Sequence, residues 1–464
     1  MPEMKLTARQ SPIERIPMQN PAPVSDRVIN LIPEERQSIF DPTVDQAREW
    51  VTRGDTRSLR AVRGSFSLLG IEGSSVRMAR TLDRPMRFFL AKRVDGPVLV
   101  VADRIDRIQD YLATVGLGDQ FHPSYTRMVP AHHVMTVHLT GCPDPAPDTK
   151  RFFTPQLDSL PQDLEVIGRR YMQAVDRELG EWMDSVPANA PIGIAFSGGI
   201  DSGSVLLLAH DILTRKGKNP QRLKAFTLSV DGGGPDVEQA REFLKAVGLE
   251  LYLEVIDVSS DLIDPEHAIR VIEDYKSLDV EAGAMCFALL SGIRHRYPDW
   301  RHILDGDGGD ENLKDYPIHE NAELTIRSVL SNPLLYQEGW GVGKLKHSSM
   351  FSGGQSRSIV RTYGPTTELG FEGFSPYTRM DVIEVAEAIP YVDLTAWSVD
   401  ALYGLKGEIV SRGVHAITGI RMPVFEKRRF QHGATTRNQF DETFSSTDAP
   451  YRRRFDEIYR QRST

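Results

Sequence analysis

The sequence is short of several residue types and patterns, and each shortage excludes a class of protein. Two cysteines among 464 residues, Cys142 and Cys286, are too few for a disulfide framework or a cysteine-based metal site, which predicts a reducing compartment. No run of about 18 apolar residues occurs, so no membrane-spanning helix and no membrane partner are expected. The N-terminal stretch "MPEMKLTARQSPIERIPMQNPAPVSDR" has no apolar core and is therefore neither a signal peptide nor an anchor. We expect a soluble, cytoplasmic protein.

An excess of basic charge is also missing. The formal net charge is -9 at pH 7, with 55 lysines and arginines against 64 acids. A surface that follows a phosphate backbone is normally basic, so no nucleic-acid partner is expected. The locally cationic tail "YRRRFDEIYRQR" mixes its arginines with acids and aromatics, as a solvated helix face does.

Three regions follow one another along the chain. Residues 1–40 are polar and punctuated by proline, which predicts an extended N-terminal segment. Residues 41–155 hold short apolar runs such as "MRFFLAKR" and "PVLVVADRI", which predict a smaller β-rich domain. In residues 156–464 strand-like runs alternate with helical periodicity, and this predicts a parallel sheet covered by helices, followed by a helical C-terminal part. The expected fold class is α/β.

The most informative stretch is "IGIAFSGGIDSGSVLLLAH", in which a polar, glycine-rich turn separates an apolar strand from an apolar helix. The turn falls at the carboxyl end of a parallel strand, where such folds bind ligands. Gly198 and Gly199 let the backbone approach a ligand, and the N-terminus of the following helix favours an anion such as phosphate. Ser197 and Ser202 add hydroxyl donors. Asp201 adds a carboxylate that suits a metal ion bridging to phosphate.

The same turn has a plain structural explanation. Glycine and serine make tight strand-to-helix turns, with Asp201 or Ser202 as the N-terminal cap of the helix. The turn is more specific than that, because it lacks the lysine of a Walker A loop and the GxGxxG spacing of a dinucleotide fold. "SGGIDS" instead resembles the SGGxDS pyrophosphate loop of the N-type ATP pyrophosphatases, which cleave ATP between its α and β phosphates.

Two later stretches narrow the resemblance to the asparagine synthetase and β-lactam synthetase family. "ILDGDGGDENLKDYP" resembles the family's GDGGDE stretch, and "PVFEKRRFQHG" is similar to the region that carries its catalytic lysine. The three motifs occur in the family's order over roughly residues 165–433. An EF-hand calcium loop is disfavoured, because Gly309, Asp310 and Tyr316 stand where that loop needs an acid or asparagine, a glycine and a glutamate.

The resemblance implies a HUP-like ATP pyrophosphatase domain that activates a carboxylate as an acyl-adenylate and releases pyrophosphate. ATP and Mg²⁺ are the implied cofactors. The residues implied to contact ATP or pyrophosphate are Ser197, Gly198, Gly199, Asp201, Ser202, Leu228 and Gly306. Asp201 and Asp310 would bind the Mg²⁺, which neutralises the charge of the departing pyrophosphate.

The resemblance also implies two catalytic residues. Lys427 would stabilise the negative charge that develops on the phosphate and on the carbonyl oxygen. Without the other motifs it would belong to a surface cluster with Arg428 and Arg429. Asp307 stands where asparagine synthetases carry an acid and β-lactam synthetases a tyrosine, and it would take a proton from the attacking nitrogen.

The source of the nitrogen depends on what the first domain lacks. Asparagine synthetases carry a cysteine directly after the initiator methionine and use it to hydrolyse glutamine, whereas this chain begins Met1-Pro2-Glu3. Residues 41–155 still resemble the later half of a glutaminase domain, so a degenerate Ntn-glutaminase-like domain is expected. We expect a substrate amine to supply the nitrogen, as in the β-lactam synthetases. An ammonia-dependent amidating enzyme is the alternative.

The substrate itself is not identified beyond a small-molecule carboxylate and an amine. Asp279, Glu281 and Glu338 are candidates to bind the amine, with solvent-facing positions as the alternative. A catalytically inactive nucleotide-binding protein is a further alternative, since one domain has already lost its chemistry. A tRNA-modifying enzyme with the same loop is disfavoured by the acidic charge and the missing paired cysteines. A homodimer is one option for the oligomeric state.

Overall fold

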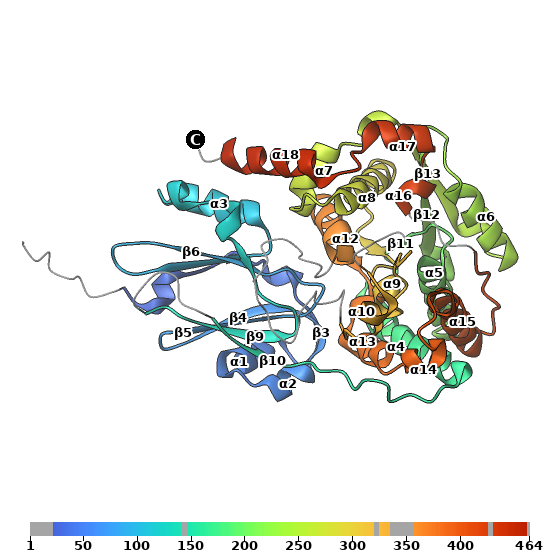
Figure 1. Cartoon of the computed structure of the whole chain (residues 1–464), viewed down its shortest axis with the longest axis horizontal. Helices are drawn as coiled ribbons and strands as arrows, with labels where there is room; N and C mark the ends of the chain where they lie inside the picture. The colour runs from blue at the N-terminus through green and yellow to red at the C-terminus, as the bar shows by residue number, and fades with distance from the viewer. Residues whose placement is uncertain (1–21, 141–146, 320–323, 335–356, 426–429, 462–464) are drawn as a thin grey trace, which may run out of the picture.

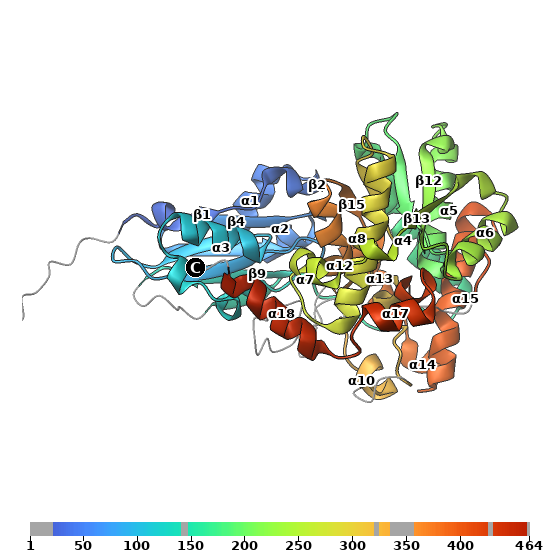
Figure 2. The same cartoon turned by 90° about the horizontal axis from the view of Figure 1, so that it is seen from above.

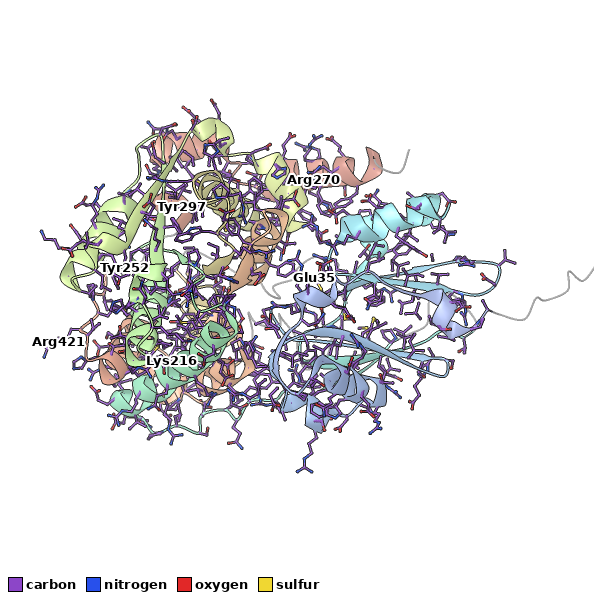
Figure 3. All side chains as sticks on the ribbon, turned by 180° about the vertical axis from the view of Figure 1, so that it is seen from behind. Glu35, Lys216, Tyr252, Arg270, Tyr297 and Arg421 are labelled. Atoms are coloured by element: carbon purple, nitrogen blue, oxygen red, sulfur yellow. The ribbon has the colours of Figure 1, made fainter. Side chains whose placement is uncertain are left out.

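The computed structural model describes residues 22–140, 147–319, 324–334, 357–425 and 430–461. Two parts lie side by side along the long axis, a β-rich part (residues 24–151) and a larger α/β part (residues 164–461) (Figure 1). In the view from behind, Glu35 lies where the two parts meet, and Arg421 lies on the far side of the α/β part (Figure 3). The expected α/β fold class is confirmed: a parallel sheet, a helical C-terminal part and a β-rich N-terminal region are all present.

The β-rich part contains two four-stranded sheets, with strand orders β1-β7-β6-β8 and β10-β9-β5-β4. Its strands are β1 (Val28–Asn30), β2 (Ser38–Asp41), β3 (Arg63–Ser65), β4 (Ser67–Glu72), β5 (Ser75–Arg80), β6 (Arg87–Ala91), β7 (Val98–Ala102), β8 (Arg127–Met128), β9 (His133–His138) and β10 (Asp148–Arg151). Helices α1 (Val44–Arg53) and α2 (Thr56–Arg60) cover one side, and α3 (Ile105–Thr114) covers the other (Figure 1). Strand β1 and most of β2 fall within residues 1–40, so this segment contributes the edge strand β1 to one four-stranded sheet and pairs with β3 through β2.

Strand β7 shows how the layers are held together. All five of its residues are buried, because apolar neighbours cover both of its faces. Successive side chains of a strand point to opposite faces. Leu99 and Val101 lie in the core between the two sheets, whereas Val98 and Val100 lie with Ile108 of α3. The result is a four-layer arrangement in which helices sandwich two sheets.

The α/β part is built on a five-stranded parallel sheet with the order β13-β12-β11-β14-β15. Its strands are β11 (Ile192–Ala195), β12 (Leu223–Val230), β13 (Leu253–Val258), β14 (His302–Leu304) and β15 (Glu372–Phe374). Its helices are α4 (Leu164–Ser185), α5 (Ile200–Arg215), α6 (Asp236–Ala246), α7 (Pro265–Ile272), α8 (Ser277–Arg296), α9 (Gly309–Asn312), α10 (Ile326–Leu330), α12 (Arg357–Glu368), α13 (Met380–Glu387), α14 (Tyr391–Thr395), α15 (Val399–Thr418), α16 (Phe430–Gly433), α17 (Arg437–Thr443) and α18 (Asp448–Gln461).

Helices bury both faces of this sheet, which explains its continuous apolar runs. Ile194 and Leu304 share a core with α4, α5 and α15, whereas Phe226 and Ile303 share a core with α7 and α8. Figure 2 shows α8 and α5 on either side of the strands. Strand β11 needs glycine at its centre, because a Cβ on Gly193 would lie 2.7 Å from Ile303 Cδ1.

Buried ion pairs join the two parts. Arg379 of the α/β part lies with its Nη1 3.5 Å from Oδ2 of Asp83 in the β-rich part. Glu273, which directly follows α7, forms an ion pair with Arg87 in β6, with Oε2 lying 2.9 Å from Nε. All four side chains are at most 11% exposed. Over the described ranges, no helix is long and apolar enough to cross a membrane.

Candidate active site

Two loops meet at the carboxyl ends of neighbouring parallel strands. The first loop (Ser197–Ser202) follows β11, and the acidic loop (Asp305–Asp310) follows β14, which pairs with β11. A Cβ added to Gly306 would lie 2.8 Å from Asp201 Cβ, and one on Gly309 would lie 2.2 Å from Asp201 Oδ1. The two loops therefore pack so closely that only glycine fits at either contact.

The first loop has the backbone of an anion-binding turn. Gly198 adopts φ +72°, a left-handed conformation that favours glycine, and a Cβ there would also lie 3.0 Å from the backbone of Ala240. The Ser197 and Ser202 hydroxyls lie 3.3 Å apart, and the backbone N–H of Gly199 donates to Ser197 Oγ at 3.3 Å. The simple capping explanation is wrong in its residues, because Gly199 is the N-cap and no side chain caps α5. The start of α5 is thus suited to bind an external anion.

A buried lysine that the sequence analysis missed joins the two loops. Lys406 of α15 is 3% exposed, and its Nζ lies 2.6 Å from Asp201 Oδ2. The same ammonium group pairs with Asp310 and lies 3.6 Å from Asp315 Oδ2. Burial opposes its charge, but the three carboxylates outweigh burial and raise the pKa of Lys406 well above its usual value. Lys406 is therefore a permanent cation at the site.

One feature of the sequence does indicate that Lys406 is buried. It stands in "ALYGLKGEIV", where it is flanked by residues of the buried helix face, including Leu402, Leu405 and Ile409. A charged residue on a buried face is rarely tolerated without a partner. That pattern predicts a buried ion pair. It does not say which acids complete it, because Asp201 is 205 positions away and Asp310 is 96 positions away.

Asp201 and Asp310 are brought together as the resemblance implies. Both are carboxylates on adjoining loops and share contact with one ammonium group. Carboxylate oxygen is the ligand type that Mg²⁺ prefers, so the pair fits a role in holding this ion beside phosphate. Within the described ranges, no group of three or more His, Cys, Asp or Glu forms a metal cluster. Substrate phosphates would have to complete the coordination.

Asp307 is oriented from outside its own loop. Its side chain accepts a hydrogen bond from Thr362 Oγ1 of α12, and its backbone N–H donates to Asp305 Oδ1 at 3.0 Å. Asp305 also accepts from Ser375 Oγ. Burial raises the pKa of Asp305 to about 6, although the hydrogen bonds from Ser375 and from the Asp307 backbone oppose the shift. Burial, together with Asp307 and Asp305, raises the pKa of the nearby Cys286 thiol well above its usual value.

The segment Ser375–Arg379, which follows β15, braces both loops through hydrogen bonds. The Tyr377 hydroxyl lies 2.5 Å from Ser204 Oγ in the first turn of α5. Asn312 of α9 donates from Nδ2 to the backbone carbonyl of Tyr377 at 2.8 Å. Since Ser375 bonds to Asp305, this one segment fixes the helix behind the first loop and both ends of the acidic loop.

Lys427 lies outside the described residues, but the structure places the chain on both sides of it. Upstream, a Cβ on Gly407, next to Lys406, would lie 3.1 Å from Val424 Cγ1. Downstream, the backbone N–H of Val230, at the end of β12, donates to the carbonyl of Ala434 at 3.0 Å. Both flanks thus contact elements that border the two loops.

The remaining predicted residues fall in different environments. Leu228 is 1% exposed, and its side chain lies in the apolar core beside α8. Asp279 and Glu281 lie in α8 and are 1% and 9% exposed, so the solvent-facing alternative is wrong for both. Asp279 and Cys286 are seven positions apart, which places them on one face of the helix about 10 Å apart. Glu338 lies outside the described residues.

Both loops lie in a part of the chain that matches a known family. Residues 183–350 match the family model described as asparagine synthase, and this range includes the first loop and the acidic loop. A comparison with curated proteins finds no significant match. Among solved structures, the chain is similar to the NMN synthetase from Francisella tularensis, with 13% identity and a TM-score of 0.24 over 53% of this chain and 95% of that chain. This structural likeness is too loose to indicate a shared function. The asparagine synthase match confirms the family resemblance for residues 183–350 and supports an ATP-dependent, ligase-type enzyme.

Proposed function

From an asparagine synthase domain at residues 183–350, we propose that this chain is a carbon-nitrogen ligase that forms AMP and diphosphate. It adenylates a substrate carboxylate and captures the acyl-adenylate with a substrate amine, without using glutamine. One observation carries the proposal. Asp201, Asp310 and the buried Lys406 converge where the first loop packs on the acidic loop, at the start of α5.

The first loop binds the two outer phosphates of ATP. The uncapped N-terminus of α5 and the Ser197 and Ser202 hydroxyls supply the donors. Asp201 and Asp310 would hold Mg²⁺, which would neutralise charge on the departing pyrophosphate. Lys406 adds a fixed cation next to both carboxylates, so little reorganisation is needed when charge develops on the leaving group.

The reaction runs in two displacements. A carboxylate oxygen of the substrate attacks the α-phosphorus, the bond to the β-phosphate bridging oxygen breaks, and pyrophosphate leaves. The amine nitrogen then attacks the acyl carbon, and AMP leaves with the bonding electrons. Asp307 takes the proton released by the nitrogen, and Thr362 orients its carboxylate for this task. Lys427 stabilises the charge on the carbonyl oxygen and phosphate.

Cys286 is poorly suited to hydrolyse glutamine. Hydrolysis of glutamine by a thiol requires an accessible thiolate. Cys286 is buried in α8, and burial together with two aspartates raises the pKa of its thiol. Cys142, which lies outside the described residues, is the other cysteine of the sequence. Asp307 gives a specific reason to keep ammonia as a second nucleophile, since asparagine synthetases carry an acid at this position.

A panel assay tests the proposal. The full chain is incubated with ATP and Mg²⁺, and pyrophosphate release is measured across pairs of carboxylates and amines, with ammonium and glutamine as separate arms. We expect pyrophosphate and AMP in equal amounts with at least one carboxylate and amine pair. Turnover only with ammonium would select the amidating alternative. Release that requires glutamine, or no AMP and pyrophosphate with any pair, would overturn the proposal.

Lys427→Ala separates catalysis from binding. We expect ATP affinity to change little and product formation to fall by about 100-fold or more, because a preorganised cation is lost from the transition state. Lys245→Ala, at an exposed position of α6, is the matched control and should keep wild-type turnover. If Lys427→Ala turns over at a rate near wild type, the role assigned to this lysine is wrong.

A further inference from the structure

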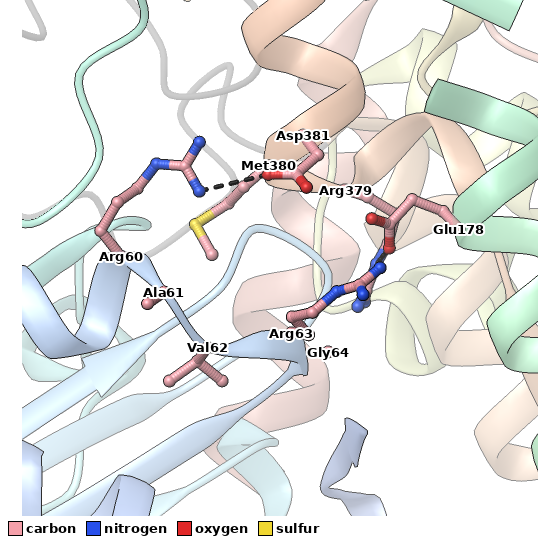
Figure 4. Close-up of a pocket in the computed structure, with 9 residues that line it drawn as sticks. All are labelled: Arg60, Ala61, Val62, Arg63, Gly64, Glu178, Arg379, Met380 and Asp381. Carbon is pink, nitrogen blue, oxygen red and sulfur yellow. Dashed lines mark hydrogen bonds and ion pairs between the residues drawn. The ribbon is translucent and has the colours of Figure 1, made fainter. Parts of the chain in front are cut away.

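Two cavities share Arg60 in their lining: the first lies at the junction of the β-rich part and the α/β part, and the second is lined by residues 56–60 and 151–154. The first has a volume of about 200 Å³ and is shown in Figure 4; its lining residues are Arg60, Ala61, Val62, Arg63, Gly64, Glu178, Arg379, Met380 and Asp381. The second has a volume of about 320 Å³ and is lined by Thr56, Arg57, Arg60, Arg151, Phe152 and Thr154. None of these residues belongs to the first loop or the acidic loop, so the proposed chemistry does not use either cavity.

The second cavity has the composition of an anion site. Its lining residues are three arginines, two threonines and one phenylalanine, and no acid is among them. The nearest acid in the sequence, Asp55, is engaged with its own helix, since it accepts from the backbone N–H of Ser58 at 3.1 Å and from Ser58 Oγ at 2.6 Å. Arginine forks bind phosphate and carboxylate groups through paired, charge-assisted hydrogen bonds.

Arg60 connects this cavity to the synthetase part. Its Nη1 lies 3.2 Å from Asp381 Oδ1, and its Nη2 lies 3.0 Å from Glu384 Oε2, both in α13. Figure 4 shows Arg60 reaching from α2 toward Asp381 across the first cavity. The guanidinium also lies 5.1 Å from the ring centre of Phe153. An anion in the second cavity would compete with the two α13 carboxylates for this one side chain.

Helix α13 leads directly to the nucleotide loops. It begins at Met380, one residue after the segment Ser375–Arg379. Within that segment, Tyr377 bonds to Ser204 of α5 and to Asn312 of α9. Because α13 continues directly from this segment, we expect a change in how Arg60 holds α13 to reach α5 and α9 through the hydrogen bonds of Tyr377.

We propose that the second cavity is a regulatory site for a small, multiply charged anion, either a phosphate ester or a polycarboxylate. The bound anion draws Arg60 away from α13 and thereby changes the affinity of the two loops for nucleotide. The regulatory part rests on nucleotide binding by the proposed enzyme, but not on its turnover.

Calorimetric titration of the full chain tests the site. Citrate and glycerol 3-phosphate are titrated separately at constant ionic strength, with saturating α,β-methylene-ATP present to occupy the nucleotide loops. We expect one of the two anions to bind the wild type, and its identity separates the polycarboxylate from the phosphate ester. The double variant Arg57→Gln/Arg151→Gln should weaken binding by about tenfold or more, since two charge-assisted contacts are lost. Arg57→Lys/Arg151→Lys should retain part of the affinity.

The controls decide where the anion binds. Arg93→Gln removes an exposed arginine of the β-rich part that pairs with Asp95, so it should leave the titration unchanged. No binding of either anion to the wild type overturns the site. Equal affinity in Arg57→Gln/Arg151→Gln, or equal loss in Arg93→Gln, overturns its location.

The effect of the bound anion on nucleotide affinity tests the proposed regulation. The dissociation constant of α,β-methylene-ATP is measured with and without saturating anion, in the wild type and in Arg57→Gln/Arg151→Gln. We expect a change of about fivefold in the wild type, at the low end of typical coupling between sites, and none in the double variant. An anion that binds without changing nucleotide affinity overturns regulation. Because no turnover is measured, failure of the proposed ligase activity gives a separate result.

Discussion

Lys406 is the residue whose loss should reveal most about the site. Lys406→Met removes a buried cation that pairs with both Asp201 and Asp310, and leaves these carboxylates without its charge. We expect pyrophosphate release to fall by about 100-fold or more. The free energy of unfolding should fall by about 3 kcal/mol, as when one partner of a buried ion pair is removed.

Lys216→Met is the matched control for that prediction. Lys216 pairs with Asp184 at 2.6 Å, but its side chain is 34% exposed and lies at the far end of α5. Thermal unfolding and pyrophosphate release should both stay near wild type in this variant. If Lys406→Met also kept wild-type turnover, Lys406 would be a structural residue and not part of the proposed phosphate site.

Titration of Asp305 should lower the free energy of unfolding as the pH rises, which is opposite to the effect of a carboxyl group whose pKa is lowered by folding. Burial raises the pKa of Asp305 to about 6 in the folded chain, above the usual value of 3.8. Because the folded state holds this proton more tightly, Asp305 contributes stability below about pH 4. That contribution is lost as the pH rises to about 6. Asp305→Asn mimics the protonated form, so its free energy of unfolding relative to wild type should rise by roughly 2 kcal/mol from pH 4.5 to pH 7.5.

Urea unfolding at both pH values measures this difference. Other carboxylates titrate in both proteins, so only the gap between variant and wild type is informative. A gap that stays constant, or that shrinks as the pH rises, would show that Asp305 does not titrate as described.

At the scale of elements, Lys406 owes its position to the contact between α4 and α15. A Cβ on Gly413 of α15 would lie 2.1 Å from the carbonyl oxygen of Gly168 in α4, and one on Gly168 would lie 2.5 Å from the carbonyl of Ile409. The two helix backbones therefore approach as closely as glycine allows. This approach sets how deeply α15 lies against the first loop.

Gly413→Ala tests that contact. Forced separation of the helices should lower the free energy of unfolding by about 1–3 kcal/mol, which exceeds the helix-propensity gain of about 1 kcal/mol. Gly404→Ala in the same helix is the control, because nothing lies within 4 Å of an added Cβ there. It should stabilise the chain slightly. Thermal unfolding separates the two variants, and equal melting temperatures would contradict the packing argument.

Element patterns also show what the sequence could predict. Both loops were found because each follows a short apolar strand and shows a recognisable motif. Lys406 was missed because its partners come from other loops, and helical periodicity carries no information on contacts so far apart. The strand order of the β-rich part was not predicted either, since β1 pairs with β7 across about 70 positions. The acids Asp279 and Glu281 remain predicted substrate residues, and only tertiary packing shows that they are buried.

At the scale of the whole molecule, Arg379 joins the β-rich part to the α/β part. Its Nε donates to Glu178 of α4 at 3.1 Å, and its Nη1 bonds to Ser65 of β3 and lies near Asp83. Burial opposes ionisation of Asp83, but Arg84 and Arg379 outweigh it and hold the pKa of this carboxyl below its usual value. Both parts therefore share one buried cation.

Arg379→Met should destabilise the chain by about 3–5 kcal/mol, because buried carboxylates lose their partner. Pyrophosphate release should fall as well, since Arg379 directly follows the segment that braces both loops. Arg177→Met is the control: Arg177 pairs with Asp381 at 2.8 Å but is 49% exposed, and its loss should change stability by under about 1 kcal/mol. Denaturant unfolding followed by probes in both parts provides the measurement. Unfolding of the β-rich part alone in wild type would contradict the shared role.

The glycine contacts between the first loop and the acidic loop have a consequence for engineering. Since Gly306 and Gly309 lie directly against Asp201, neither loop has room to change shape while the other stays as it is. Grafting a new nucleotide or substrate preference onto this scaffold by exchanging one loop should fail sterically. A functional exchange would have to replace residues 197–202 and 305–310 together.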